Sequence, residues 1–383
     1  MTGSPADVLL DCRWLPIGGA GRVTAALLAG LRADPPEGSW VLLGPPAVVP
    51  LAWTGADVVV STRDPRQGWG QRCWFELPPA RLTVFLHQQR PLRALPAITT
   101  IYDTIQLRNA SSPWQGRSRR RFLRAVARRS REVVTISEYS RSCIHRDLGY
   151  PLERITVAVP PVDPRRAHRL RRLRQLRPPR EVALYVGQFA PHKNLTRLVE
   201  AYGATGFAAR GGRLVLVGGR ARELAAARAL AAGHPSVEVR GWVGDEELDE
   251  LMASARMLVQ PSLEEGYGLP VAEAQACGLP VCVSTGGALG ELTGPGAHRF
   301  SPTSVAEMAA ALDACATGPA QKAPAAVTAA GARAFAGAYR RVVDRALGPP
   351  TPPGTSILPR GWRSRELAGG LGVRLGPAGG APR

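Results

Sequence analysis

The chain has 383 residues, more than one hydrophobic core usually organises, so two domains are expected. Its 45% hydrophobic and 21% charged residues exclude wholesale disorder. The 49 lysine and arginine residues outnumber the 30 acidic ones and give a net charge of +19, so nucleic acid, an anionic membrane face and phosphorylated substrates are the partners to consider.

Neither a leader nor a metal framework is expected. No segment approaches the roughly 18 apolar residues that a spanning helix needs, and the first apolar run is flanked by Asp7 and Asp11, unlike a signal peptide. A cytoplasmic protein is the expectation. The six cysteines are scattered and form no Cys-x-x-Cys pair, so neither a disulfide framework nor a zinc site is indicated.

Short apolar runs alternate with helical patterns over residues 1–163. The pattern predicts a strand at 8–10, a turn at 18–21 and a helix at 22–31. Further β-branched strands are predicted at 41–43, 58–60, 84–86, 98–101 and 133–136. Brief buried strands separated by helices are typical of parallel sheets, so this part predicts a doubly wound, Rossmann-like α/β domain.

Arginine dominates residues 164–180, which contain no acid and are predicted to be a solvated linker or an exposed helix. Residues 181–330 predict a second Rossmann-like domain, with strands at 182–186, 214–217, 237–239, 257–259 and 281–283. Ligands of open α/β sheets bind beside the carboxyl ends of the strands, so a cleft between two such domains is the expected site. Residues 331–347 predict a C-terminal helix, and 348–383 a disordered tail rich in Pro, Gly and Arg.

The most informative motif spans residues 263–280. Gly266 and Gly268 let a loop bring backbone N–H groups close to a ligand, and Pro270 suits the first turn of a helix whose positive end favours a pyrophosphate. Glu273 is expected in that first turn, where its two oxygens could accept both hydroxyls of a ribose, while Glu265 could accept from a sugar ring. An acidic helix start beside a glycine-rich loop, with no ligand, is the alternative.

A second motif, at residues 185–195, follows the first strand of the second domain. Lys193 is expected at the start of a helix, where its charge opposes the helix dipole, and a bound phosphate would explain that placement. Taken alone, this segment could be a surface loop. The two motifs together favour a phosphate-binding site.

Glu265 and Glu273, with the Gly-Tyr-Gly-Leu-Pro sequence between them, and Gly187 followed by Pro-His-Lys-Asn at 191–194, resemble the family 4 retaining glycosyltransferases of GT-B fold. The glycine loop at 19–22, the segments 134–140 and 242–251, and Glu291 are also similar to that family. The resemblance covers about residues 8–347.

The resemblance implies an enzyme that binds a nucleoside diphosphate sugar without a metal ion or cofactor, with the first domain holding the acceptor. Lys193 would bind the β-phosphate, Glu273 the ribose and Glu265 the transferred sugar, and Lys193, Glu265 and Asp103 are the catalytic candidates. The other residues that the resemblance assigns to the donor are Gly19, Gly21, Gly187, Asn194, Gly266, Tyr267, Gly268 and Leu269.

Two positions depart from the family pattern. Gln188 stands where many relatives have an arginine, and Tyr102 precedes Asp103 where the family often has a histidine. His87 could line the cleft or belong to the core. These departures leave open a catalytically degenerate GT-B protein that acts as a partner subunit. The cations that could replace the missing arginine are His192, Arg220 and Arg22.

The substrates are less defined. The Pro-His-Lys-Asn sequence resembles mannosyl- and rhamnosyl-type members and weakly favours a GDP-linked hexose, whereas the hydroxyl acceptor could be a saccharide, a lipid-linked saccharide or a small molecule. A basic segment at 117–131 predicts an amphipathic helix that is either a solvated face or a peripheral contact with an anionic leaflet at the inner membrane face. Nucleic-acid binding would depend on charge alone and is not expected.

Overall fold

The computed structural model describes residues 5–15, 17–61, 77–92, 96–294, 296–318, 329–348 and 371–374. The chain divides into two compact units. The first comprises Met1–Ile136, Ser140–Pro160 and Ala332–Arg383, and the second comprises Ser137–Tyr139 and Pro161–Gly331. The first unit is therefore built from stretches at both ends of the chain.

An eight-stranded sheet runs through the first unit in the order β14-β3-β2-β1-β4-β5-β6-β7. Its strands are β1 (Ala6–Asp11), β2 (Trp40–Gly44), β3 (Asp57–Ser61), β4 (Ala80–Phe85), β5 (Ala97–Thr100), β6 (Glu132–Thr135), β7 (Ile155–Val157) and β14 (Leu371–Arg374). All neighbours are parallel except β14, which is antiparallel to β3. The strand order reverses at β1 and β4, where a doubly wound sheet opens a crevice for ligands.

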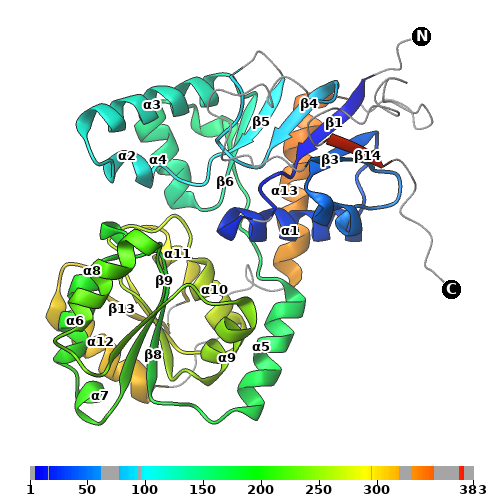
Figure 1. Cartoon of the computed structure of the whole chain (residues 1–383). Coiled ribbons are helices and arrows are strands. Elements are labelled where there is room, and N and C mark those ends of the chain that lie inside the picture. Colours follow the sequence, from blue (N-terminus) through cyan, green and yellow to red (C-terminus); the bar gives the residue numbers. More distant parts are fainter. Residues whose placement is uncertain are drawn as a thin grey trace. The chain divides into compact units, whose positions relative to one another are not determined.

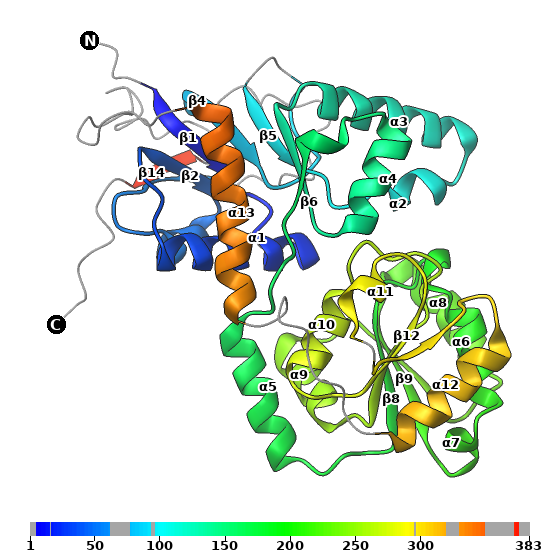
Figure 2. The same ribbon diagram turned by 180° about the vertical axis from the view of Figure 1, so that it is seen from behind.

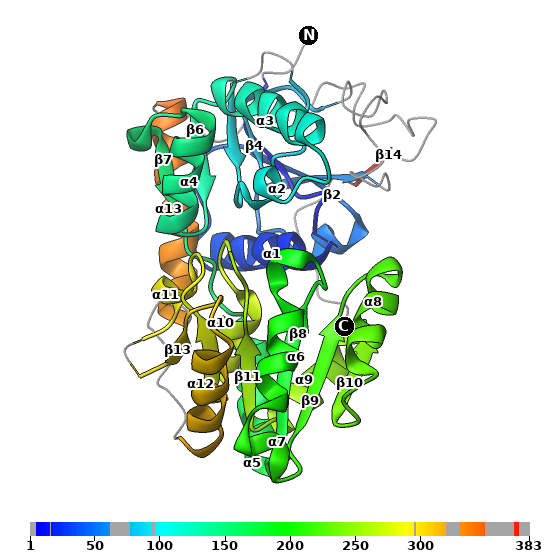
Figure 3. The same cartoon turned by 90° about the vertical axis from the view of Figure 1, so that its left-hand side faces the viewer.

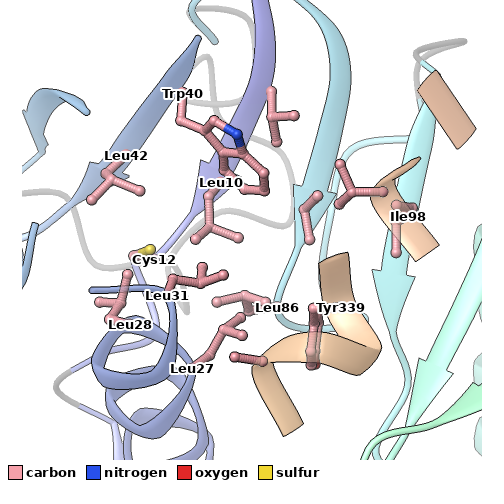
Figure 4. Close-up of a cluster of buried hydrophobic side chains, with 14 of the residues drawn as sticks. Leu10, Cys12, Leu27, Leu28, Leu31, Trp40, Leu42, Leu86, Ile98 and Tyr339 are labelled. Atoms are coloured by element: carbon pink, nitrogen blue, oxygen red, sulfur yellow. The ribbon is translucent and has the colours of Figure 1, made fainter. Parts of the chain in front are cut away.

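Two helices from opposite ends of the chain complete the core of this unit. Figure 4 shows Leu27, Leu28 and Leu31 packed near Leu10 of β1, with Tyr339 beside them. The helices of this unit are α1 (Gly18–Ala33), η1 (Pro46–Leu51), α2 (Ile105–Arg108), α3 (Pro113–Arg128), α4 (Glu138–Leu148), η4 (Leu152–Arg154) and α13 (Ala329–Leu347). The apolar side of α13 is thus buried against the first sheet, which α13 crosses in Figure 2.

The second unit contains a six-stranded parallel sheet in the order β10-β9-β8-β11-β12-β13. Its strands are β8 (Val182–Gly187), β9 (Arg213–Gly218), β10 (Val237–Gly241), β11 (Met257–Gln260), β12 (Val281–Ser284) and β13 (His298–Phe300). The strand order has the same form as in the first sheet, with β8 and β11 at the reversal. Both units are therefore doubly wound, and the predicted fold class is confirmed.

Helices cover both faces of the second sheet. They are α5 (Pro164–Leu176), η5 (Pro191–Lys193), α6 (Leu195–Gly203), α7 (Gly206–Ala209), α8 (Ala221–Ala231), α9 (Asp245–Ser254), α10 (Leu269–Ala276), α11 (Leu289–Leu292) and α12 (Val305–Thr317). Figure 1 shows α6 and α12 on one side of this sheet and α9 and α10 on the other, and Figure 3 shows α6 beside α12. Helix α5 packs against α9 and α10.

The structure differs from the sequence-based expectations in three places. The glycines at 18–21 lie in the first turn of α1 rather than in a separate turn, and Gly18 begins this helix with a φ of 49°, a backbone conformation that favours glycine. In the arginine-rich segment 164–180 the helix expected as one alternative is present as α5, but it belongs to the second unit rather than to a linker, and its Arg166 is buried. Most of the tail 348–383, for which disorder was expected, lies outside the described residues. Within this tail, the described residues Leu371–Arg374 form strand β14.

Candidate active site

The predicted phosphate-binding residues of the second unit follow two neighbouring strands at the reversal of its sheet. Strand β8 ends at Gly187 and leads to η5, whose last residue is Lys193. Strand β11 ends at Gln260 and leads to the loop that carries Glu265. Since β8 and β11 pair in parallel, their carboxyl ends meet at the crevice where doubly wound sheets bind ligands.

The structure brings Lys193 and Glu265 into direct contact. Lys193 Nζ lies 2.7 Å from Glu265 Oε2, and the two side chains are only 13% and 14% exposed. The same carboxylate oxygen accepts from Ser262 Oγ at 3.2 Å and Gln260 Nε2 at 3.3 Å. The loop after β11 therefore provides a carboxylate held by three donors, and η5 provides an ammonium group beside it.

Helix α10 directs its N-terminus toward the same loop. Its N-cap residue, Gly268, adopts the left-handed conformation at φ 103°, and Pro270 occupies the first turn as predicted. Because a glycine cap has no side chain to accept from the helix, the N–H groups at this end can serve an anion. The placement predicted for Glu273 is wrong by one turn, since α10 begins at Leu269 and Glu273 is its fifth residue.

Glu273 is nevertheless buried, at 4% exposure, and Arg166 Nη1 lies 3.5 Å from its Oε1. Tyr267, in the preceding loop, is buried as well, and burial raises the pKa of its phenol. The residues of the motif at 263–280 thus form an enclosed structure rather than a solvated acidic loop.

Two glycines that the sequence analysis missed shape this loop. Gly286 and Gly287 follow β12, and a Cβ atom on either would overlap the backbone of residues 262–265. The Ala288 N–H donates to the Glu265 carbonyl at 2.8 Å. The Gly-Gly pair in the printed sequence was the available signal, since adjacent glycines often permit close approach of two backbones.

Asn194 has a role in the structure that the sequence did not predict. It lies in the left-handed region at φ 61°, the only described non-glycine residue with a positive φ, and it is buried. Its Nδ2 donates to the Pro261 carbonyl at 3.0 Å and the Pro302 carbonyl at 2.7 Å. Its side chain therefore ties η5 to the loop after β11 and fixes the position of Lys193.

The structure offers two nearby candidates for the charge missing at Gln188. Arg220 is exposed at the start of α8 and directly follows Gly219, whose N–H donates to the Gly187 carbonyl at 3.0 Å. His192 is half-buried, and burial together with the Lys193 charge lowers its pKa. Arg220 is therefore the better source of a positive charge near neutral pH.

The first unit holds Gly19, Gly21 and Asp103. Gly21 lies in the first turns of α1, where a Cβ atom would overlap the Leu15 carbonyl oxygen, so any larger residue is excluded. Asp103 follows β5, and its Oδ1 accepts from the Ile105 N–H at 3.0 Å at the start of α2. All three positions belong to the first unit.

His87 and Tyr102, the other residues considered in the first unit, follow strands β4 and β5 of the first sheet. The His87 ring stacks on Trp14 with centroids 3.7 Å apart, and burial lowers its pKa to about 4. Tyr102 donates to the Leu86 carbonyl at 2.8 Å, and its burial raises its pKa. Both rings are therefore neutral near pH 7.

One family model matches part of the second unit. Residues 180–317, which include both motifs of the second unit, match the model described as glycosyl transferases group 1. This match covers 138 of the chain's 383 residues. Over residues 180–317 the match agrees with the resemblance drawn from the sequence motifs.

Two curated proteins to which the chain is similar are mannosyltransferases. The chain is 33% identical over 186 residues to an O-antigen chain mannosyltransferase B of Escherichia coli, covering 45% of this chain and 48% of that protein. It is 43% identical over 79 residues to an MMP alpha-(1->4)-mannosyltransferase of Mycolicibacterium hassiacum, covering 20% and 19%. The matches therefore span about half or less of these relatives.

Solved structures share the fold over most of the chain. HepE of Anabaena in complex with UDP and glucose matches with a TM-score of 0.59 at 17% identity, covering 89% of this chain and 95% of that one. WaaG, a glycosyltransferase involved in lipopolysaccharide biosynthesis, matches with a TM-score of 0.56 at 18% identity, covering 88% and 95%. These likenesses place the two units in the GT-B fold.

Two features are absent from the described residues. Within them, no three His, Cys, Asp or Glu side chains gather closely enough to hold a metal ion. No helix in the described part of the chain is long and apolar enough to cross a membrane.

Proposed function

We propose that the chain is a retaining glycosyltransferase that moves a hexose, of mannose type, from a nucleoside diphosphate sugar to a hydroxyl acceptor. The observation that carries this proposal is the contact between Lys193 and Glu265 at the end of β8 and β11. An ammonium group, a carboxylate and a helix N-terminus at one sheet edge match a diphosphate joined to a sugar.

The Lys193–Glu265 pair would open when the donor binds. Lys193 Nζ would exchange Glu265 for a β-phosphate oxygen, and Glu265 would accept from hydroxyls of the transferred sugar. Gln260 and Ser262 already contact Glu265, so its carboxylate would keep neutral donors during this exchange. In this way one pair of residues would align both ends of the bond that breaks.

The proposed reaction needs no protein nucleophile. The bond from the anomeric carbon to the β-phosphate oxygen breaks, and the acceptor oxygen forms a bond to that carbon on the same face. The acceptor proton passes to the departing phosphate. Lys193 and the N–H groups at the start of α10 stabilise the charge that develops on the diphosphate, a preorganised electrostatic effect that requires no divalent ion.

The donor assignments rest on separate grounds. Glu273 would bind the ribose hydroxyls, as its place in the motif and its burial favour. A mannose-type sugar is favoured by the two mannosyltransferase relatives, and a GDP-linked donor by the Pro-His-Lys-Asn sequence. UDP-sugars remain the competing donors, because HepE was solved with UDP. Gly187 would shape the donor loop through its backbone and Asn194 through its side-chain hydrogen bonds, and Asp103 would act on the acceptor side.

A panel of sugar nucleotides tests the proposal. The purified chain is incubated with GDP-mannose, UDP-glucose and related donors, with and without EDTA, and release of nucleoside diphosphate is measured. The anomeric configuration of any product is read by NMR. Turnover that survives EDTA and retains the configuration agrees with the proposal. If no donor is hydrolysed and neither GDP nor UDP raises the melting temperature, the chain is instead a degenerate partner subunit.

We also propose a peripheral contact of α3 with an anionic membrane on the cytoplasmic side. The apolar residues of α3, Leu123 and Val126, are buried in the first unit, which leaves arginines and the 72%-exposed Trp114 facing outward. Binding would therefore be electrostatic with one aromatic anchor. The protein should float with anionic vesicles at low salt and lose this binding at high salt. The double variant Trp114→Ala/Arg120→Ala should also fail to float. Equal flotation with neutral vesicles would contradict this.

A further inference from the structure

A buried ion cluster joins three helices of the second unit. Arg166, the third residue of α5, is 8% exposed. Its Nη2 lies 2.9 Å from Asp249 Oδ1 on α9, and its Nη1 lies 3.5 Å from Glu273 Oε1 on α10. Figure 1 shows α5 alongside α9 and α10, in agreement with their packing. The arginine-rich segment thus sends one guanidinium group to the predicted ribose-binding carboxylate.

Burying charged side chains costs free energy unless each charge is paired with an opposite one in a favourable geometry. Asp249 and Glu273 are 2% and 4% exposed, and unpaired buried carboxylates would be strongly destabilising. Arg166 and Arg169 balance the two negative charges. The planar guanidinium of Arg166 contacts one carboxylate through each Nη, an arrangement that a flexible ammonium group cannot reproduce.

The helix packing does not by itself require Arg166. Arg169, one turn further along α5, donates to Asp249 through Nε at 2.8 Å and Nη2 at 2.5 Å. The link from α5 to α9 therefore has a second arginine. What Arg166 adds beyond its partners on α9, Asp249 and the exposed Asp245, is the contact with Glu273.

We infer that Arg166 is a positioning residue for nucleotide binding: it holds the Glu273 carboxylate in the orientation that accepts hydrogen bonds from the ribose. This inference rests on the proposed function, in which Glu273 binds the ribose. It assigns a role in donor recognition to a helix that lies outside the family match at 180–317.

The test compares ribose with deoxyribose in wild type and variants. Dissociation constants of GDP and 2′-deoxy-GDP, and of UDP and 2′-deoxy-UDP, are measured by calorimetry. For the base that binds, wild type should prefer the ribonucleotide by about 10- to 100-fold, the size expected for a hydrogen bond to a charged group. Arg166→Met should reduce this preference to about threefold or less, because the Glu273 carboxylate is no longer held in place.

Matched variants separate positioning from general damage. Arg165→Met removes an exposed neighbouring charge, and Arg169→Met removes the other partner of Asp249, so both should keep the wild-type preference. Arg166→Gln, which keeps side-chain N–H donors, is the second variant should Arg166→Met fail to fold, and it too should lower the preference. Thermal melting confirms that each protein is folded.

The outcomes are distinct. A wild-type preference retained in folded Arg166→Met or Arg166→Gln overturns the positioning role and leaves the proposed function intact. Absence of any preference in wild type, despite nucleotide binding, overturns the ribose role of Glu273 on which the inference rests. If Arg165→Met also loses the preference for the ribonucleotide, the effect arises from the net charge of the helix rather than from the position of Arg166. That result would also overturn the inference.

Discussion

Acidification should weaken the first unit through His87. The His87 ring is buried against Trp14, and its Nδ1 accepts from the Gln89 N–H at 3.0 Å. Burial lowers its pKa from the ordinary 6.5 to about 4, and the Asp11 charge opposes this only in part. Protonation would also place a hydrogen on Nδ1, which could then no longer accept from Gln89.

The sign of the effect follows from proton linkage. Between pH 6.5 and 4 the unfolded chain binds a proton at His87 that the folded chain does not. The stability present above pH 6.5 is therefore lost as the pH falls toward 4. Using these two pKa values, His87 should lower the free energy of unfolding by about 2 kcal/mol between pH 7 and pH 5.

Urea titrations at pH 7 and pH 5, followed by circular dichroism, measure this difference. His87→Phe keeps an aromatic ring against Trp14 but cannot titrate, so its loss of stability on acidification should be smaller than that of wild type by about 2 kcal/mol. His168→Gln changes an exposed histidine of α5 and should behave as wild type. Identical pH dependence in wild type and His87→Phe would refute the reasoning.

Two further predictions concern single positions. Lys193→Ala should lower kcat/KM for donor turnover by about 10²- to 10³-fold, as loss of one preorganised donor to a developing anion typically does. Arg228→Ala, at an exposed site on α8, is the control and should leave kcat/KM unchanged. Unchanged donor-saturated turnover in Lys193→Ala would count against the role of Lys193. Gly21→Ala should lower the free energy of unfolding by about 2 kcal/mol, because overlap of the new Cβ atom with the Leu15 carbonyl oxygen outweighs the roughly 1 kcal/mol that alanine gains in a helix. Gly233→Ala, with open space around the new Cβ atom, is the control. Equal stability of the two variants would contradict the predicted clash.

Most of the fold could be predicted from local patterns. The strands expected at 8–10 and 182–186 lie within β1 and β8, because short apolar runs bounded by polar residues or glycine are a strong local signal. The strands β7 and β13 were missed. Both have only three residues, and β13 contains a histidine and an arginine, so neither offers a hydrophobic pattern long enough to detect.

The candidate site was predictable in part. Lys193 and Glu265 stood out because their neighbouring Gly, Pro and Asn residues mark loops at the ends of strands, and the structure brings the two side chains together. Arg166 could not be distinguished from the other arginines of its segment, since their sequence environment is similar. Nor could Asn194 be recognised as a residue that ties two loops together, because its acceptors belong to Pro261 and Pro302.

The sequence by itself determined where most strands and helices form and which loops are predicted to bind a phosphate, because side-chain periodicity and turn residues act within a few positions of one another. Tertiary structure alone decided that α13 returns to the core of the first unit and that Arg166 lies buried beside Glu273. Both outcomes depend on surfaces contributed by distant parts of the chain, and no local pattern encodes which buried surface an apolar helix face or a long cation will meet.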